Sequence, residues 1–427
     1  MSLELALLLG SFALLVLIDA PIAVALGLAS AVYLAVADMA PMMVVAQRMI
    51  AGIDSFTLLA IPLFLMAGLL MVHGGLAPRI VNLFAAMVGR TTGGLAIVMV
   101  AACMMFGSLS GSGVADVVAI GTMMLPSMKA RGYDPAFSAA ALGCAGSLGT
   151  VIPPSIVLIV YGTATNSSIG DLFVGAIIPG LLLALALSIT AWLVARKRGY
   201  PTEPFPGFGR VGYYLLQSLP GMLLIAIIFG GVRSGMFTAT ESSCVAVVYA
   251  LLVTALVYRS MSWRDFVHAT QQAVRTTAMV LLIIGMAGAF GWLMAYLHVA
   301  QISLNWMQSV SDNPFVILLM INVVLLVLGT FMDMSPLIII TTPIFLPVVS
   351  AFGVDPVHFG VIMILNLGIG LNTPPLGPVQ FVAAAVARIS IWEAMRSVWP
   401  FYAAGLVVLL MVTYIPALSL WLPGVFR

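Results

Sequence analysis

Apolar runs separated by short polar corners make up almost the whole chain. The runs at residues 173–195 and 278–297 are long enough to cross a membrane as helices, which takes about 20 apolar residues. A polar loop is expected at 298–313. Other runs, such as residues 94–106, are shorter and stop at glycines, prolines or polar residues. The pattern predicts an all-α polytopic membrane protein in which some helices are discontinuous or re-entrant.

Two interruptions bracket one segment of the first half. Residues 107–113 read GSLSGSG and residues 149–155 read GTVIPPS, both inside sequence apolar enough to lie at membrane depth. Glycine permits positive φ and proline removes a backbone donor, so neither stretch favours a regular helix. In hydrocarbon, broken backbone survives only where protein buries it or where it lines a cavity. The two interruptions therefore predict a binding site.

This segment occurs twice in the chain, at a constant offset of 221 residues. The matched positions are Leu125-Pro126 with Leu346-Pro347, Gly132 with Gly353, Asp134-Pro135 with Asp355-Pro356, Gly149 with Gly370, Pro153-Pro154 with Pro374-Pro375, and Ser112 with Asp333. A period of half the chain indicates duplication of a whole unit rather than a solenoid. We expect two halves, residues 1–200 and 201–427, each with its own pair of interruptions.

The basic residues predict how the two halves face. Arg196, Lys197 and Arg198 follow the run at 173–195, and loops rich in Lys and Arg stay on the cytoplasmic side. The corner at 129–131 has two basic residues, whereas its repeat at 350–352 has no charge. The first corner is then cytoplasmic and the second is not, which is the pattern of an inverted repeat. In such folds substrate and coupling ions bind near the midplane, at discontinuous helices.

Composition restricts the class of protein. The chain has 427 residues, 63% hydrophobic and 7% charged, against about 25% charged in soluble domains. The chain is therefore expected to lie in a lipid bilayer. Its net charge of +2 gives no reason to expect a nucleic acid partner. Its three cysteines are far apart, lack C-x-x-C spacing and are expected to be small core residues. The P-loop pattern G-x-x-x-x-G-K-[ST] is absent, so ATP hydrolysis within this chain is not expected.

The interrupted helices can bind ions of both signs. Free N–H groups at a half-helix N-terminus attract anions, and freed carbonyls suit hard cations such as Na⁺. Side-chain oxygens at the interruptions come from Ser110, Ser112, Thr150, Asn372, Thr373 and Asp333. We therefore expect two Na⁺ sites, one per repeat, with an anionic substrate between them.

Two aspartates lie inside apolar sequence, and ionisable groups there point to function. These are Asp116 and Asp333. A second interpretation of Asp116 is that it caps the start of a helix. Serine and glycine in membrane helices also serve close helix packing, so their presence alone does not prove ligand binding.

Five motifs together resemble the large membrane subunit of tripartite ATP-independent periplasmic (TRAP) transporters. They are LAIPLF at 59–64, GSLSGSGVAD at 107–116, IPPS at 152–155, MDMSP at 332–336 and GLNTPP at 370–375. The chain is similar, more distantly, to the group that includes sodium–dicarboxylate symporters. The resemblance implies an inverted-repeat, elevator-type transporter, in which a moving domain of two re-entrant hairpins and two unwound helices carries substrate and Na⁺ past a scaffold.

The resemblance also implies partners and a location. It predicts a small four-helix membrane subunit of the Q type, a periplasmic substrate-binding protein of the P type, and a multi-pass position in the bacterial inner membrane. Its substrates would be small organic anions: C4-dicarboxylates, sialic acid, sugar acids or keto acids. Na⁺ would be the coupling ion, with no organic cofactor and no transition metal.

Site residues follow from matching the family's motifs to this chain. The first Na⁺ site would use Ser108, Ser110, Gly111, Ser112, Gly149, Ile152 and Pro154. The second would use Asp333, Gly370 and Thr373. Substrate would contact Ser112, Gly113, Asp116, Thr150, Pro153, Asn372 and Pro374.

Other functions were weighed against this one. A stand-alone Na⁺/carboxylate symporter would need no binding protein, and uptake by this chain alone would identify it. An intramembrane enzyme would need a catalytic group at depth, yet Asp116 and Asp333 occupy non-equivalent positions in the repeats and no histidine accompanies the serine run. A channel would not need duplicated interruptions. Transport without catalysis is therefore the expected function.

Overall fold

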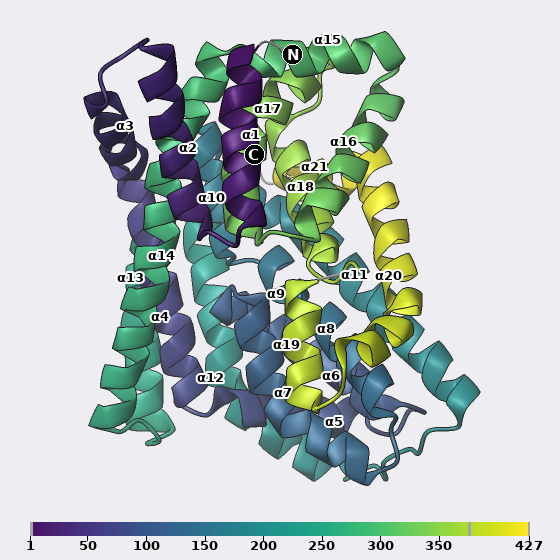
Figure 1. Ribbon diagram of the computed structural model, residues 1–427. Helices are drawn as coiled ribbons and strands as arrows, with labels where there is room; N and C mark the ends of the chain where they lie inside the picture. Colours follow the sequence, from purple (N-terminus) through teal and green to yellow (C-terminus); the bar gives the residue numbers. More distant parts are fainter. Residues whose placement is uncertain (1–2, 375–376, 426–427) are drawn as a thin grey trace.

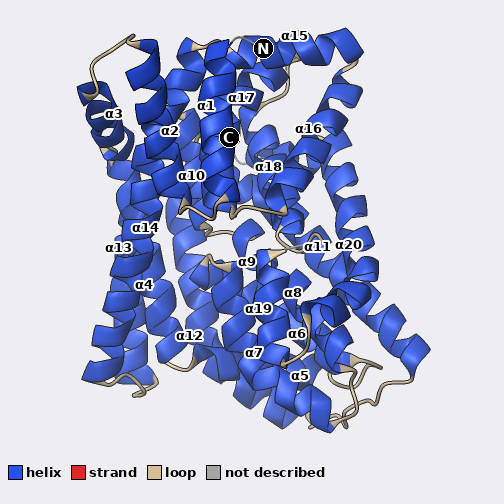
Figure 2. Cartoon of the chain, in the orientation of Figure 1, coloured by secondary structure: helices blue, strands red, loops and turns tan. Residues whose placement is uncertain are grey.

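The computed structural model describes residues 3–374 and 377–425, with only the backbone at Leu109. Every regular element in these residues is a helix (Figure 2). Seven helices are long and apolar enough to cross a membrane, or up to nine if each of two bent pairs counts as one span. The predicted all-α polytopic class is confirmed for the part of the chain described.

One group of helices is built on the 34-residue helix α14 (Trp263–Tyr296). This helix is longer than the span predicted at 278–297, because a capping box of Ser262 and Asp265 starts it far upstream. Helices α2 (Ile22–Ala37), α3 (Met43–Ile53) and α4 (Ala60–His73) pack against it directly. The other members pack against these helices or their neighbours, and they are α1 (Leu3–Leu17), η1 (Phe56–Leu59), α12 (Phe208–Arg233), α13 (Ala239–Leu252) and the π-helix η2 (Val253–Val257).

The first predicted interruption is the tip of a helical hairpin. Helix α6 (Gly94–Ser110) and helix α7 (Gly113–Ala130) are joined by Gly111 and Ser112 alone. Gly111 has φ +61°, which glycine adopts without a Cβ penalty. Ser112 caps α7, where its hydroxyl accepts the N–H of Ala115 at 3.4 Å.

The second interruption divides a helix. Helix α8 (Pro135–Gly146) runs into the single turn α9 (Leu148–Val151), residues 152–155 are non-helical, and α10 (Ile156–Thr165) continues at an angle of 43°. A long helix, α11 (Ile169–Arg198), then crosses the molecule.

The second half of the chain repeats these elements. Hairpin helices α16 (Pro314–Gly329) and α17 (Met334–Ala351) are followed by α18 (Pro356–Gly370), a break, α19 (Pro378–Ala387), the long α20 (Ile391–Tyr414) and α21 (Ala417–Val425). Both ends of α17 and the start of α18 fall 221 residues after their counterparts in α7 and α8. The corners match as well, with Gly132 at φ +79° and Gly353 at φ +75°. The repeat seen in the sequence is therefore structural.

The two copies face opposite ways. Helices α6 and α7 occupy the lower half of Figure 1, whereas α16 and α17 occupy the upper half. One hydrophobic cluster runs through both copies and the long helices beside them. The inverted repeat is confirmed. The division of the chain at residue 200, which falls between α11 and α12, stays a prediction.

The polar loop predicted at 298–313 is wrong. The segment forms helix α15 (Val299–Val310), which lies across the top of Figure 1 at 119° to α16. Val299 and Met307 are buried, while Gln301 and Asn305 lie exposed or half-exposed on the other side. Its counterpart α5 (Leu76–Val88) at the lower end is amphipathic too. Both helices carry enough polar residues to look like loops when only total hydrophobicity is considered.

Candidate ion and substrate site

Glycines bring the first hairpin tip against the first broken helix. A Cβ at Gly149 would lie 2.7 Å from the Cα of Gly107, and a Cβ at Gly113 would lie 3.1 Å from the carbonyl oxygen of Gly146. A Cβ at Gly111 would lie 3.2 Å from Ile156. Larger residues would push the tip away, so these glycines set the distance between α6, α7 and α9. The structure therefore places the residues predicted for the first Na⁺ site in one region.

Asp116 lies at the centre of this contact. It is in the first turn of α7 and is fully buried. Its Oδ1 accepts a hydrogen bond from the hydroxyl of Ser110, and its Oδ2 has no hydrogen-bond partner among the described residues. A Cβ at Gly107 would lie 2.5 Å from Oδ2. The carboxylate is therefore held between the hairpin and α9, and Ser112 rather than Asp116 is the helix cap.

No basic side chain in the described residues forms an ion pair with Asp116. Burying an unpaired carboxylate costs several kcal/mol, so such groups in membrane proteins pair with a cation or another partner. The unpartnered oxygen and the nearby open backbone are suitable ligands for a hard cation such as Na⁺.

The open backbone is shorter than the sequence suggested. Ser108 and Ser110 belong to α6, and Gly149 and Thr150 belong to the turn α9. The Ser108 hydroxyl donates to the Met105 carbonyl at 2.7 Å, as serine in a helix commonly does. Serine and glycine content does not reveal where a helix ends, because packing against neighbours keeps such residues helical.

Thr150, Ile152 and the two prolines form the far wall of this region. The Thr150 hydroxyl donates to the Ser147 carbonyl at 2.7 Å, which leaves its oxygen able to accept. The Ile152 side chain is directed to α11, where a Cβ at Gly180 would lie 2.6 Å from it, so only its backbone is available for a ligand. Pro153 and Pro154 are buried.

The second hairpin meets the second break in the same way. A Cβ at Gly329 would lie 3.1 Å from the Cα of Gly370, where α18 ends. Asp333 caps α17 by accepting the N–H of Met334 at 2.8 Å, and it is exposed. The Thr373 hydroxyl donates to the Ile369 carbonyl at 3.0 Å. In the described residues, no hydrogen bond joins Asp333 to Gly370 or Thr373.

The two breaks lie next to each other. A Cβ at Gly143 of α8 would lie 3.2 Å from Oδ1 of Asn372 and would overlap Oε1 of Gln380. Both amides are buried, and both oxygens lack a hydrogen-bond partner in the part of the chain that the structure describes. The amide nitrogen of Asn372 donates to the Gly368 carbonyl and that of Gln380 to the Ala139 carbonyl, each at 3.2 Å. The unpaired oxygens are available to a cation or to donors on a substrate.

Some residues in this region were missed by sequence reasoning. Gln380 is the lone amide in the apolar run of α19, which was the available signal. Asn366 of α18 was also missed, and its amide nitrogen donates to the Asn322 carbonyl of α16 at 2.9 Å. Pro374 lies within the second break, and Pro375, the last residue of the GLNTPP motif, lies outside the described residues.

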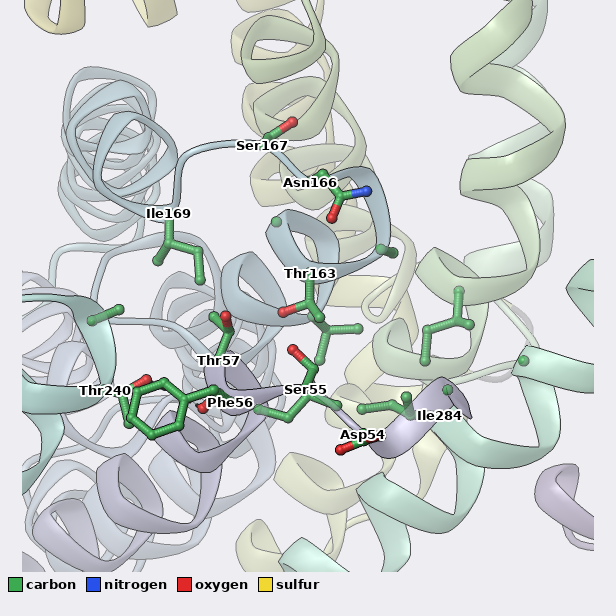
Figure 3. Close-up of a pocket in the computed structure, with 18 of the residues that line it drawn as sticks. Asp54, Ser55, Phe56, Thr57, Thr163, Asn166, Ser167, Ile169, Thr240 and Ile284 are labelled. Atoms are coloured by element: carbon green, nitrogen blue, oxygen red, sulfur yellow. Dashed lines mark hydrogen bonds between the residues drawn. The ribbon is translucent and has the colours of Figure 1, made fainter. Parts of the chain in front are cut away.

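A large cavity lies away from the two breaks. It has a volume of about 910 Å³ and is lined by residues 54–58, the end of α10, the start of α13, and parts of α14 and α17. Figure 3 shows Asp54, Ser55, Thr163 and Asn166 at its walls. None of the predicted site residues lines it.

Comparison with known proteins places this geometry in a family. The family model described as "Tripartite ATP-independent periplasmic transporter, DctM component" matches residues 9–418. The "Isethionate TRAP transporter permease protein DctMQ" of Oleidesulfovibrio alaskensis is 41% identical over 97% of this chain, which spans 66% of that protein. The "C4-dicarboxylate TRAP transporter large permease protein DctM" of Rhodobacter capsulatus is 37% identical over 96% of both chains.

A solved structure agrees with the fold. The Alcanivorax borkumensis YdaH transporter superposes with a TM-score of 0.64 over 89% of this chain and 87% of its own, at 15% identity. The expectation of a permease rather than an enzyme agrees with the names of the relatives. With paired hairpins, paired breaks and a family match along nearly its whole length, the chain belongs to the DctM family, the large permease component of tripartite ATP-independent periplasmic transporters.

Proposed function

We propose that this chain couples the entry of Na⁺ to the uptake of an organic acid across the bacterial inner membrane. The substrate would arrive from a periplasmic binding protein, and a small four-helix membrane subunit would complete the permease. The hairpins and broken helices would move together past the α14 group in an elevator motion. Relatives named for isethionate and C4-dicarboxylates support a small organic anion as the substrate class.

The buried Asp116 carboxylate carries the sodium part of this proposal. Its Oδ2 has no partner among the described residues, yet it is enclosed at the contact of two glycines beside an interrupted helix. A Na⁺ held by Asp116, Ser110, Ser112 and freed carbonyls would compensate the buried charge. We therefore place Asp116 with the first Na⁺ rather than with the substrate. Asp333, Gly370 and Thr373 would hold the second ion.

The substrate would lie where the two breaks meet. Asn372, Thr150 and the tip residues Ser112 and Gly113 would contact it there, and the N-terminus of α7 would supply a positive dipole end for the anion. Gln380 joins this group because its unpaired oxygen borders the same glycine as Asn372. Pro153 and Pro374 would shape the two walls.

The test is uptake by the complete transporter in proteoliposomes, measured against Na⁺ concentration. Asp333→Asn and Ser112→Ala should each raise the Na⁺ concentration for half-maximal uptake by about tenfold, which corresponds to a loss of about 1.4 kcal/mol of ion binding. Both variants should still insert in the membrane, because Asp333 is exposed and Ser112 stays a small residue.

Ser168→Ala is the matched control for the serine variant. Ser168 caps α11 as Ser112 caps α7, with its hydroxyl accepting the N–H of Asp171 at 3.1 Å. Both serine variants lose a cap, which costs about 1 kcal/mol, but only Ser112→Ala should change the Na⁺ dependence. Unchanged Na⁺ dependence in Asp333→Asn and Ser112→Ala would refute the assignment of both sites.

A further inference from the structure

A second cavity, of about 420 Å³, lies at the lower end of the first hairpin, away from the breaks. It is formed by the last turns of α7, the start of α8 and the end of α19. Lys129 and Arg388 line it together with Thr122, Tyr133 and Ser138, whose hydroxyls donate to backbone carbonyls. No carboxylate is among its lining residues, and Asp134 nearby is already paired with Arg198 at 2.6 Å.

The two basic side chains at this cavity have no partner of their own. Within the described residues neither Lys129 nor Arg388 makes a hydrogen bond or an ion pair through its side chain, and both are exposed. They come from helices far apart in the sequence that pack against each other. Two unpaired cations at one concave space without a carboxylate are an arrangement that can recognise an oxyanion.

The equivalent place in the other repeat lacks this charge. Arg388 ends α19 in the left-handed conformation at φ 56°, and Asn166 ends α10 in the same conformation at φ 53°. Asn166 lines the 910 Å³ cavity, whose nearby carboxylate is Asp54. The two cavities differ in their other walls, and of the two only the one at the lower end is lined by basic side chains. That end carries the Arg196–Arg198 cluster, so the positive-inside rule makes it cytoplasmic.

An exposed stripe on α7 connects the hairpin tip with this cavity. Val114, Val118, Thr122 and Pro126 are all exposed and are spaced four residues apart, which puts them on one helix face. The stripe starts two residues after Ser112 and reaches the cavity at Thr122.

We propose that Lys129 and Arg388 form a second, cytoplasmic oxyanion site that receives the carboxylate of the transported acid after it leaves the breaks. The identity of the cargo rests on the function proposed above, whereas the site itself does not depend on Na⁺. Basic residues also occur at helix C-termini and on cytoplasmic surfaces for general electrostatic reasons. Those reasons predict no saturable binding at this cavity.

The test is binding of succinate and of inorganic phosphate to the purified chain in phosphatidylcholine nanodiscs, in choline chloride without Na⁺. Ligand-observed NMR should show saturable binding of at least one of the two anions. In Lys129→Gln/Arg388→Gln the affinity should fall at least tenfold. The control Lys197→Gln/Arg396→Gln removes the same charge from exposed positions near the same face and should bind like the wild type.

Three outcomes would overturn the proposal. The first is no saturable binding by the wild type, and the second is equal binding by the Lys129→Gln/Arg388→Gln variant. The third comes from nanodiscs that contain phosphatidylglycerol. If this lipid abolishes succinate binding and co-purifies with the wild type but not with the variant, the site holds a lipid headgroup instead of free acid. Failure of Na⁺ coupling would leave these measurements unaffected, so the two proposals fail separately.

Discussion

At the scale of single residues, the sequence predicted the candidate site from polar residues and helix breakers placed at membrane depth. Ser112 and Asp333 were predicted as equivalent positions, and both cap the second helix of their hairpin. The position of Asp116 against Gly107 and Gly149 could not be predicted, because it depends on how α6, α7 and α9 pack. Gln380 was missed for the same reason, since its neighbour Gly143 is distant in the sequence.

Asp116 provides a test at this scale. Bound Na⁺ stabilises the folded state by about 2.7 kcal/mol per site when its concentration is a hundred times the dissociation constant. The unfolding temperature of the wild type should rise when NaCl replaces choline chloride. In Asp116→Asn the first Na⁺ site is lost, so this rise should be about half as large. Without Na⁺, the variant should be at least as stable as the wild type, because it buries no charge.

The exposed Asp312 is the control for this measurement. Asp312→Asn should respond to NaCl like the wild type. If NaCl raises the unfolding temperature of Asp116→Asn as much as that of the wild type, Asp116 binds no Na⁺. The same conclusion follows if NaCl does not change the unfolding temperature of the wild type.

At the scale of elements, the apolar runs predicted the hairpins and the broken helices but misjudged amphipathic ones. Helices α7 and α17 both have 18 residues and begin after the predicted interruptions. Helix α15 was predicted as a loop because only one of its faces is apolar. The contact between each hairpin and its broken helix rests on a glycine pair, Gly107 with Gly149 and Gly329 with Gly370.

These glycine pairs predict an order of stability. Gly149→Ala would place a methyl group against Asp116 and Gly107, and such overpacking costs about 1–3 kcal/mol. In Gly370→Ala the new Cβ would lie 3.0 Å from Gly329, so a smaller shift relieves it. Gly230 in α12 has open space around it, and Gly230→Ala should be neutral or gain up to about 1 kcal/mol.

Thermal unfolding in detergent micelles measures this order. The unfolding temperature should be lowest for Gly149→Ala, intermediate for Gly370→Ala and highest for Gly230→Ala. If Gly149→Ala unfolds at the temperature of Gly230→Ala, the hairpin tip does not rest on α9 as the structure has it.

At the scale of the whole molecule, a few charges on two corners were enough to predict the inverted repeat. The basic corner follows α7 in the lower half of Figure 1, and the uncharged equivalent corner follows α17 in the upper half. The lower corner is also tied to the segment between α11 and α12, by the ion pairs of Arg131 with Glu203 and of Arg198 with Asp134. These contacts join residues more than 60 positions apart and were not predictable from composition or periodicity.

Opposite orientation of the repeats predicts opposite accessibility of equivalent residues. Ala130 ends α7 and Ala351 ends α17, and both are exposed. In cells, Ala351→Cys should react with a membrane-impermeant maleimide added outside the inner membrane. Ala130→Cys should react only after permeabilisation, because its basic corner stays in the cytoplasm. The two variants change the same residue type at matched positions, so the intrinsic reactivity of the thiols should be similar.

The background for this experiment is Cys244→Ser. Cys103 and Cys144 are buried and should not react, whereas Cys244 on α13 is exposed, against the expectation that all three cysteines are core residues. Labelling of both variants from outside, or of both only after permeabilisation, would mean that the repeats share one orientation. The hairpins would then enter the membrane from the same side, and the contact between the two broken helices at Gly143 and Asn372 could not form in the membrane as it does in the structure.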